Sequence, residues 1–356
     1  MTTWRRRLAQ VVSVLVVGVA MVSCQAAPPK VETGMTVHLR GADAASLSRQ
    51  FDLMADMHVT WVRVDVDWSV VEPGRGQFDW TYPDTLVDAA TAHGMKVLIV
   101  VAFSPAWTRA VAADPGAEPA AKASHLRPDQ ISDFADFARL AAERYAPRGV
   151  GGWEIWNEPN STKFWPPAPN PDEYGGLFRA AASAIRSVDP KATLLIGGLA
   201  PWYAGPEAGV TPTDYLERLY ANGTAQLADA IAVHPYSFPG LPMDASPKNI
   251  IGGFADLPAL HGVMVKHDDG DKKIWVTEFG APTGTGPNAV SEADQAKALV
   301  QAHDQVLGWE WAGPLIYYEL VDGGTNPTEI EENFGVLRED LSLKPAAIAL
   351  TDDEKE

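Results

Sequence analysis

The chain contains little cysteine and fewer basic than acidic residues. Its 356 residues include one cysteine, Cys24, which excludes a disulfide framework and a metal site built from several cysteines. The 28 Lys and Arg residues stand against 46 Asp and Glu residues, a formal net charge of −18 at pH 7. Because nucleic-acid binding depends on basic patches that neutralise phosphates, we expect no nucleic-acid partner.

Metal-binding and nucleotide-binding motifs are also missing from the sequence. The eight His residues show neither HxH nor HExxH spacing, so no metal site is indicated. The segment 284–289 (GTGPNA) has the letters of a dinucleotide-binding loop, but Pro287 stands where a backbone amide would have to bind phosphate. We interpret this segment as a turn and expect no cofactor.

Long apolar runs are absent after the N-terminus. There, Arg5–Arg7 precede an apolar run over residues 8–22, and Cys24 follows at its end. This order resembles a bacterial lipoprotein signal, in which the Cys is lipidated and becomes the first residue of the mature protein. The resemblance implies a signal peptide over residues 1–23, and a lipidated Cys24 with a polar tether over residues 24–34. An ordinary cleaved signal and an uncleaved anchor helix are the alternatives, and all three export the rest of the chain.

Short β-branched runs alternate with longer amphipathic patterns between residues 35 and 350. This order is typical of βα units that build a parallel sheet. Most of the predicted strands lack period-2 alternation, as expected for strands buried on both faces. Eight strands are predicted, at 36–39, 61–66, 96–102, 152–156, 193–196, 230–234, 273–277 and 314–318. Eight helices are predicted, at 45–57, 82–93, 127–145, 174–188, 212–221, 249–266, 291–307 and 344–349.

These elements predict the α/β class with the architecture of a (β/α)8 TIM barrel, formed by a single catalytic domain over residues 35–350. The alternative, a doubly wound sheet, usually has about five to seven strands. The last residues, 351–356, form an acidic tail. In a barrel the loops that follow the strands build the active face, so the polar residues at strand ends are the functional candidates.

Two glutamates stand at such strand ends. Glu158 follows the predicted strand 152–156, and Pro159 prevents that strand from continuing. Glu278 ends the predicted strand 273–277, three strands further around the ring, so the two carboxyl groups can flank one bond. A carboxylic acid that protonates a leaving oxygen, paired with a carboxylate that attacks the anomeric carbon or activates water, suits glycoside hydrolysis. For either residue alone, a surface or ion-paired role is the alternative.

Four motifs resemble the retaining (β/α)8 clan of glycoside hydrolases, whose nearest members are the cellulase-like family 5 and the xylosidase-like family 39. They occur in chain order over nearly the whole of residues 35–350, at 68–80 (WSVVEPGRGQFDW), 156–160 (WNEPN), 234–236 (HPY) and 276–280 (VTEFG). The resemblance implies that Glu158 is the acid/base and that Glu278 is the nucleophile that forms a covalent glycosyl-enzyme. It also implies that Asn157 hydrogen-bonds the sugar 2-hydroxyl.

The same resemblance implies roles for three further residues. Tyr236 would hold and tune the nucleophile, Arg63 would lie beneath it and favour its ionised form, and His234 would line the subsite. Two alternatives stay open. Arg63 could form a buried ion pair with Asp65 or Asp67, and His234 could be a core histidine that bonds only the backbone.

The sequence also departs from the clan. Many members have a Trp at the end of the eighth strand, as the floor of the subsite for the non-reducing sugar, where this chain has Tyr318. Family 5 usually has a His after the third strand, where this chain has the sequence SPAW, which favours family 39 and argues against cellulose-like substrates. Aromatic faces stack on pyranose rings, so four residues in predicted active-face loops indicate further subsites, with loop packing as the alternative: Trp107, Trp165, Trp202 and Tyr203.

The sequence therefore predicts an exported retaining O-glycosyl hydrolase that acts on an oligo- or polysaccharide as a monomer. Its expected location is the outer face of the cell membrane or the cell envelope, with a lipid anchor at Cys24. A catalytically inactive barrel lipoprotein that binds carbohydrate is the first alternative, and a metal-dependent lyase or phosphodiesterase is the second. Sugar identity, linkage, anomer and endo or exo action depend on loop shapes and stay open at this point.

Overall fold

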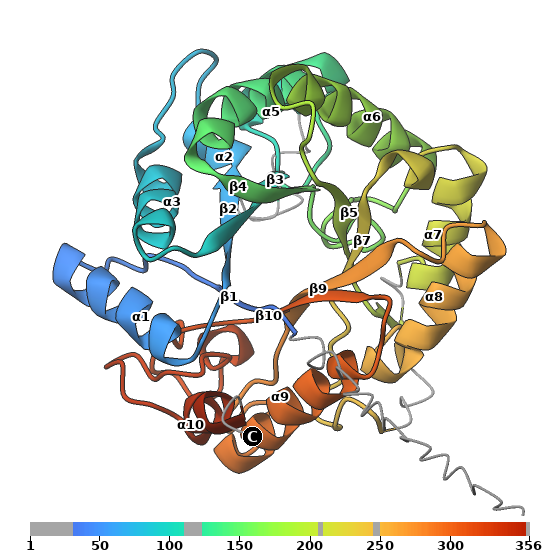
Figure 1. Cartoon of the computed structure of the whole chain (residues 1–356). Helices are drawn as coiled ribbons and strands as arrows, with labels where there is room; N and C mark the ends of the chain where they lie inside the picture. The colour runs from blue at the N-terminus through green and yellow to red at the C-terminus, as the bar shows by residue number, and fades with distance from the viewer. Residues whose placement is uncertain (1–30, 110–122, 206–208, 245–249, 354–356) are drawn as a thin grey trace, which may run out of the picture. The chain divides into compact units, whose positions relative to one another are not determined.

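A closed barrel of eight parallel strands forms the centre of the folded chain (Figure 1). The computed structural model describes residues 31–109, 123–205, 209–244 and 250–353. Around the barrel the strands follow the order β1-β10-β9-β7-β5-β4-β3-β2, and the helices form an outer ring (Figure 1). This arrangement confirms the predicted (β/α)8 barrel. The predicted signal peptide and Cys24 lie outside the described residues.

Strands and helices alternate along the described chain. The barrel strands are β1 (Thr33–Thr36), β2 (Trp61–Asp67), β3 (Lys96–Ala102), β4 (Val150–Ile155), β5 (Leu194–Leu199), β7 (Ala230–Val233), β9 (Lys273–Phe279) and β10 (Ala312–Tyr317). Two short strands, β6 (Trp202–Tyr203) and β8 (Ile250–Ile251), form a separate antiparallel pair. The helices are α1 (Ala44–Asp56), α2 (Trp68–Val71), α3 (Thr81–Ala92), α5 (Ile131–Tyr145), α6 (Pro171–Val188), α7 (Pro212–Ala221), α8 (Leu257–Lys266), α9 (Glu292–Leu307) and α10 (Pro345–Asp353).

Both ends of the barrel domain extend further than the sequence analysis predicted. β1 begins at Thr33, so the tether is shorter than the expected 24–34. The reason is the register of β1, in which Gly34 lies opposite Trp61 of β2 and Ile316 of β10. At the other end, α10 continues to Asp353, so part of the expected acidic tail is helical.

Two helices begin four or more residues later than predicted. α5 begins four residues late, because the Asp129 N–H donates to the Thr108 carbonyl at 2.7 Å and holds this segment outside the helix. α8 begins eight residues late, because β8 and a 3₁₀ turn precede it. β6 and β8 were not predicted, because strands of two residues are too short to show a hydrophobic period in the sequence. By contrast, β3 and α7 begin and end at the predicted residues.

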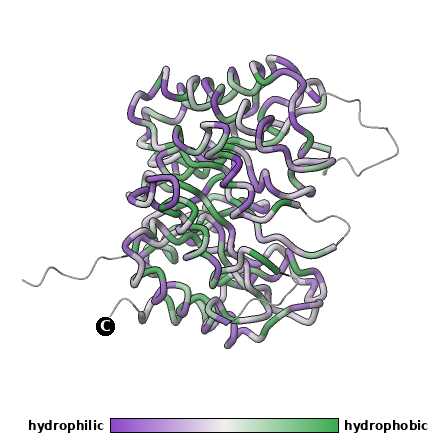
Figure 2. The backbone as a smooth tube through the Cα atoms, turned by 90° about the vertical axis from the view of Figure 1, so that its right-hand side faces the viewer, coloured by the Kyte–Doolittle hydropathy of each residue, from purple (hydrophilic) through white to green (hydrophobic). Residues whose placement is uncertain are grey.

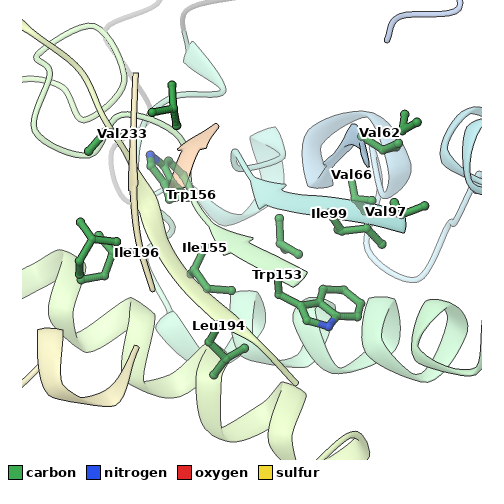
Figure 3. Packing of buried hydrophobic residues seen from close by; sticks show 14 of the residues in the cluster. Val62, Val66, Val97, Ile99, Trp153, Ile155, Trp156, Leu194, Ile196 and Val233 are labelled. Carbon is green, nitrogen blue, oxygen red and sulfur yellow. The ribbon is translucent and has the colours of Figure 1, made fainter. Parts of the chain in front are cut away.

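The larger part of the core lies between the barrel and its helices. Figure 3 shows Val62, Ile99, Trp153 and Leu194 in this layer, and all four are fully buried. The hydrophobic segments concentrate toward the middle of the molecule and the hydrophilic ones toward its periphery (Figure 2). Within the described ranges, no helix combines the length and apolar character needed to cross a membrane.

A smaller apolar cluster fills the barrel interior at the amino ends of the strands. Its buried members are Trp61, Leu98, Leu195, Ala230, Ala232, Trp275 and Ile316. The Trp61 and Trp275 rings meet edge to face with their centroids 5.0 Å apart. Glycines make room for them, since a Cβ atom at Gly151 would lie 2.5 Å from the Trp61 ring and one at Gly313 would lie 2.4 Å from Trp275. The two indoles therefore close this end of the barrel, and function is left to the opposite end.

We predict that Gly151→Ala destabilises the barrel by about 1–3 kcal/mol, because the added methyl overpacks against an indole that has no room to move. Urea denaturation measures the free energy of unfolding. Gly262→Ala is the matched control, because Gly262 lies in α8 with no atom within 4 Å of the added Cβ, and it is expected to be neutral or slightly stabilising. Equal stability of the Gly151→Ala variant and the wild type would contradict this account of the barrel floor.

Candidate active site

Glu158 and Glu278 lie at the carboxyl ends of β4 and β9 and line one cavity of about 760 Å³. One oxygen of each carboxyl group and one ring nitrogen of His234 all lie within 4.8 Å of one another. The Glu158 and Glu278 side chains are 14% and 11% exposed, so both are largely withdrawn from water and still reachable from the cavity. The structure thus brings together the two residues that the sequence analysis paired.

A strained turn carries Glu158 into the cavity. Trp156 and Glu158 have φ angles of 71° and 45°, in the left-handed region that costs a residue with a side chain about 1–3 kcal/mol. Backbone hydrogen bonds hold this conformation, from Trp156 N–H to the Val101 carbonyl at 2.8 Å and from Ser161 N–H to the Glu158 carbonyl at 2.9 Å. The chain therefore leaves β4 in a direction that a regular strand end would not allow.

Two donors hold the Glu278 carboxylate. Arg63 Nη1 lies 2.8 Å from Oε1, and the Tyr236 hydroxyl donates to Oε2 at 2.7 Å. Burial raises the pKa of the Glu278 carboxyl, and the charge of Glu158 adds to the rise, whereas His234, Arg63 and the Tyr236 hydrogen bond oppose it. Burial also raises the pKa of the Tyr236 hydroxyl well above its ordinary value, so this group remains a donor. Arg63 and Tyr236 thus lie where the family resemblance implies.

His234 lies below the carboxylates and is fully buried, so the expectation that it lines the subsite is wrong. The reason is its position at the end of β7, which directs the ring into the barrel. Nδ1 is 3.1 Å from Glu158 Oε1, and Nε2 is 3.1 Å from the Thr277 hydroxyl. Burial would lower the pKa of His234, but Glu278, Glu154 and Glu158 raise it to about 9. At neutral pH the ring is therefore a cation among carboxylates.

Glu154 is a buried member of the site that the sequence analysis missed. It points into the barrel from β4, accepts a hydrogen bond from Gly198 N–H at 2.8 Å, and lies 3.4 Å from Arg63 Nε and 3.6 Å from His234 Nε2. Burial would raise the pKa of Glu154, but the opposite charges of Arg63 and His234 lower it. An acid two residues before the end of an apolar strand was the available signal, because alternate residues of a strand share one face.

Asn157 connects the floor of the site to the cavity. Its Oδ1 accepts a hydrogen bond from Arg63 Nη2 at 3.0 Å. Since Arg63 occupies the acceptor oxygen, the Nδ2 group is the part of the amide that can donate to a ligand. Arg63 also pairs with Asp65, at 3.5 Å, so the ion pair considered as an alternative exists alongside the contact with Glu278.

A second charged cluster surrounds His38 and Glu319. His38 Nδ1 lies 2.7 Å from Glu319 Oε2, and Nε2 lies 3.7 Å from Asp65 Oδ2. Arg40 pairs with the same Glu319 oxygen. Burial would lower the pKa of His38, but hydrogen bonds to Asp65 and Glu319 raise it to about 9. Of these residues, His38 and Asp65 line the cavity.

Aromatic side chains form much of the cavity wall. They are Phe103, Phe164, Tyr203, Tyr236, Phe238, Tyr318 and Phe334. Tyr318 lies in the wall as predicted, packed edge to face against His38 and Phe334.

Three predicted stacking residues lie outside this wall, which corrects the sequence analysis. Trp107 donates from Nε1 to the Glu72 carbonyl at 3.0 Å and packs edge to face on Trp68. Trp165 is 1% exposed and belongs to the core. Trp202 precedes Tyr203 in β6, and because successive side chains of a strand point to opposite faces, the cavity receives Tyr203 instead. For Trp107 and Trp165, loop packing is the correct interpretation.

Glu158, His234 and Glu278 are close enough to be considered as metal ligands. The chemistry of His234 argues against that role. Both ring nitrogens have protein partners, Nδ1 at the Glu158 carboxylate and Nε2 at the Thr277 hydroxyl, so a cation would have to displace one of them. The trio is better described as a charged hydrogen-bond network.

Known proteins resemble this chain in sequence and in fold. Over 127 residues it is 33% identical to a β-xylosidase of Geobacillus stearothermophilus, a match that covers 34% of this chain and 24% of the relative. A family 39 glycoside hydrolase of Bacteroides cellulosilyticus WH2 superposes with a TM-score of 0.69 and 24% identity, over 91% of this chain and 63% of that one. The family 5 protein GH5_18 of Streptomyces cattleya, solved with GlcNAc, superposes with a TM-score of 0.66 and 20% identity, over 92% of this chain and 80% of that one.

The chain therefore spans about a quarter of the curated relative and about two thirds of the family 39 structure. The segment after the third strand favoured family 39, and proteins of both families share this fold. The matching family model is that of family 5, over residues 25–313, which include both strand-end glutamates. The chain belongs to the cellulase family, glycosyl hydrolase family 5.

Proposed function

We propose that the protein is a retaining glycoside hydrolase with Glu158 as acid/base and Glu278 as nucleophile. The observation that carries this proposal is the spacing of the two carboxyl groups, with one oxygen of each within 4.8 Å of the other. Retaining enzymes have their carboxyl groups about 5–5.5 Å apart, whereas inverting enzymes leave about 6.5–9.5 Å for a water molecule. The spacing here supports direct attack by Glu278.

The reaction proceeds in two displacements. In the first, Glu278 bonds to the anomeric carbon while Glu158 gives its proton to the departing glycosidic oxygen, which releases the leaving group as an alcohol. In the second, Glu158 takes a proton from water, and the oxygen of that water replaces Glu278 at the anomeric carbon. The sugar is released with its original anomeric configuration, and both carboxyl groups return to their starting protonation states.

The surrounding residues hold the carboxyl groups of Glu158 and Glu278 in position. Arg63 and Tyr236 hold Glu278 through one oxygen each, which supports its attack in one orientation. Asn157, held by Arg63, presents its amide to the sugar, where a bond to the 2-hydroxyl strengthens in the transition state. His234 acts as a positioning residue, since it reaches the sugar only through the carboxylates that it contacts.

We propose an oligo- or polysaccharide substrate, acted on outside the cytoplasm. The cavity volume of about 760 Å³ lies within the range of about 300–1,000 Å³ typical of ligand sites, and its wall is rich in aromatic rings. The partial match to a β-xylosidase makes β-xylosides the first glycosides to test. Export, a lipid anchor at Cys24 and a monomeric state rest on the sequence.

Substitution of each glutamate distinguishes the two roles. Glu278→Gln is expected to lower kcat/KM on aryl glycosides by about 10⁴-fold or more, because the nucleophile is lost. Glu158→Ala is expected to cost about 10²–10⁴-fold with poor leaving groups, and far less with dinitrophenyl glycosides, whose leaving group needs no proton. Initial rates across aryl glycosides of graded leaving-group acidity measure both effects.

Glu143→Gln is the control for these variants, because Glu143 lies on α5, away from the cavity, and pairs along that helix with Arg139. It is expected to keep wild-type rates. If a wild-type protein with an intact fold binds glycans but hydrolyses no glycoside, and both glutamate variants bind equally well, then the inactive carbohydrate-binding barrel is the correct alternative.

The raised pKa of Glu278 predicts the acid limb of the pH profile. A nucleophile must be ionised, so kcat/KM falls as pH drops through this pKa, at a pH above the ordinary glutamate value of 4.5. His234→Gln removes a cation that lowers this pKa, so the limb is expected to move to higher pH. The same substitution at His267, which pairs with Glu217, is the control. An unchanged acid limb in the His234→Gln variant would contradict the assigned coupling.

The lipid anchor is tested by Cys24→Ser in a bacterial host. The wild type is expected to incorporate labelled fatty acid and to partition into detergent, because each buried CH₂ group contributes about 0.8 kcal/mol. The variant is expected to lose the label and to appear in the aqueous phase if the signal is still cleaved. Labelling that survives the substitution would exclude Cys24 as the attachment site.

A further inference from the structure

The cavity has a second wall on the side of Glu158. In the proposed reaction Glu158 protonates the leaving oxygen, so the leaving group lies on that side of the scissile bond. The loop that follows Glu158 contributes Ser161, Thr162, Lys163 and Phe164 to the cavity wall. Tyr203, from the loop after β5, lines the same cavity and is 46% exposed. These residues are therefore available to a leaving-group sugar.

The two loops that carry this wall are joined to each other. Asn160 is 2% exposed and bridges them, with Nδ2 donating to the carbonyls of Ala200 at 2.8 Å and Val210 at 2.9 Å, and Oδ1 accepting from Ala200 N–H at 2.9 Å. Tyr203 is further fixed by the pairing of β6 with β8. The backbone segments that carry this wall are thus hydrogen-bonded to each other.

Lys163 places a positive charge at the cavity of a chain whose net charge is −18. It lines the cavity, and no carboxylate of the described residues forms an ion pair with its ammonium group. Its backbone carbonyl accepts a hydrogen bond from His125 Nδ1 at 2.8 Å, and its Nζ lies 4.9 Å from the centre of the Phe164 ring. The ammonium group thus lies over the Phe164 ring, in the wall of the cavity that Tyr203 also lines.

We propose that Lys163 and Tyr203 form a leaving-group subsite for an anionic sugar, in which the phenol ring stacks on the pyranose and the ammonium group pairs with its charge. The inference rests on the proposed hydrolase function and extends it to the substrate class. The charged group is a hexuronate carboxylate or a sulfate ester, since a lysine ammonium is a point charge that binds either. Distant charges of this acidic chain are screened beyond about 8 Å at physiological ionic strength, so the opposition to such a ligand comes from the carboxylates that line the same cavity, Asp65, Glu158, Glu278 and Glu331.

Paired aryl glycosides test the proposal with the glycone that the enzyme hydrolyses fastest. The aglycones are 3-carboxyphenyl against 3-carbamoylphenyl, and 3-sulfophenyl against 3-sulfamoylphenyl, so the members of each pair differ in charge and little in shape. The readout is the ratio of kcat/KM for the charged over the neutral member. This ratio is expected to be about three- to tenfold higher in the wild type than in Lys163→Gln, the range of an exposed to partly desolvated charge pair. Intrinsic leaving-group reactivity cancels, because each comparison uses the same substrates.

Controls separate the charge from the fold. Lys191→Gln removes the same charge from the loop between α6 and β5, at the opposite end of the barrel, and is expected to keep the wild-type ratio. Tyr203→Ala is expected to raise KM for every aglycone, whereas Tyr203→Phe keeps the ring and the KM. A preference for the sulfo pair alone would assign the charge to a sulfate ester, and a preference that includes the carboxyl pair would assign it to a hexuronate.

Two results would overturn the proposal in distinguishable ways. Equal ratios in the wild type and Lys163→Gln, with aryl glycosides still hydrolysed, would remove the anionic subsite and leave the hydrolase function intact. If the folded wild type hydrolyses no aryl glycoside, both the anionic subsite and the hydrolase function are contradicted.

Discussion

The rest of the site depends on the ion pairs of one buried group, the guanidinium of Arg63. It is 1% exposed and contacts Glu154, Asn157, Asp65 and Glu278. A charge withdrawn from water costs several kcal/mol unless opposite charges and hydrogen bonds replace its hydration. The carboxylates around Arg63 supply that replacement, and the charge of Arg63 in turn helps to lower the pKa of Glu154 and Asp65 and opposes the rise that burial causes in the pKa of Glu278.

The alternation of side chains along the strands explains how this charge reaches the centre of an apolar barrel. In β2, Trp61 closes the floor, Arg63 lies above it and Asp65 reaches the cavity, each two residues after the last. The residues between them face the helices and join the larger core. The barrel interior therefore changes from indole packing to ion pairs to a carboxylate-lined cavity along its own axis.

The loops above the barrel decide what this chemistry acts on. The left-handed turn at Trp156 and Glu158 directs the Glu158 carboxyl group, the proposed acid/base, into the cavity, and Asn160 joins the two loops beside it. His38 and Arg40 form ion pairs with Asp65 and Glu319, whereas Lys163 pairs with no carboxylate of the described residues. Under the proposed function, a substrate in this cavity meets paired charges at His38 and an ammonium group at Lys163.

The sequence by itself was enough to predict the barrel, its eight strands and the pair Glu158 and Glu278, because strand ends in a βα repeat must meet at one face. It also placed Arg63 and Tyr236 through a family resemblance. Tertiary structure alone decided that Glu154 joins the site, that His234 lies beneath the cavity, and that Tyr203 rather than Trp202 enters it. These outcomes depend on burial and strand pairing between segments far apart in the chain, which local patterns in a single sequence do not record.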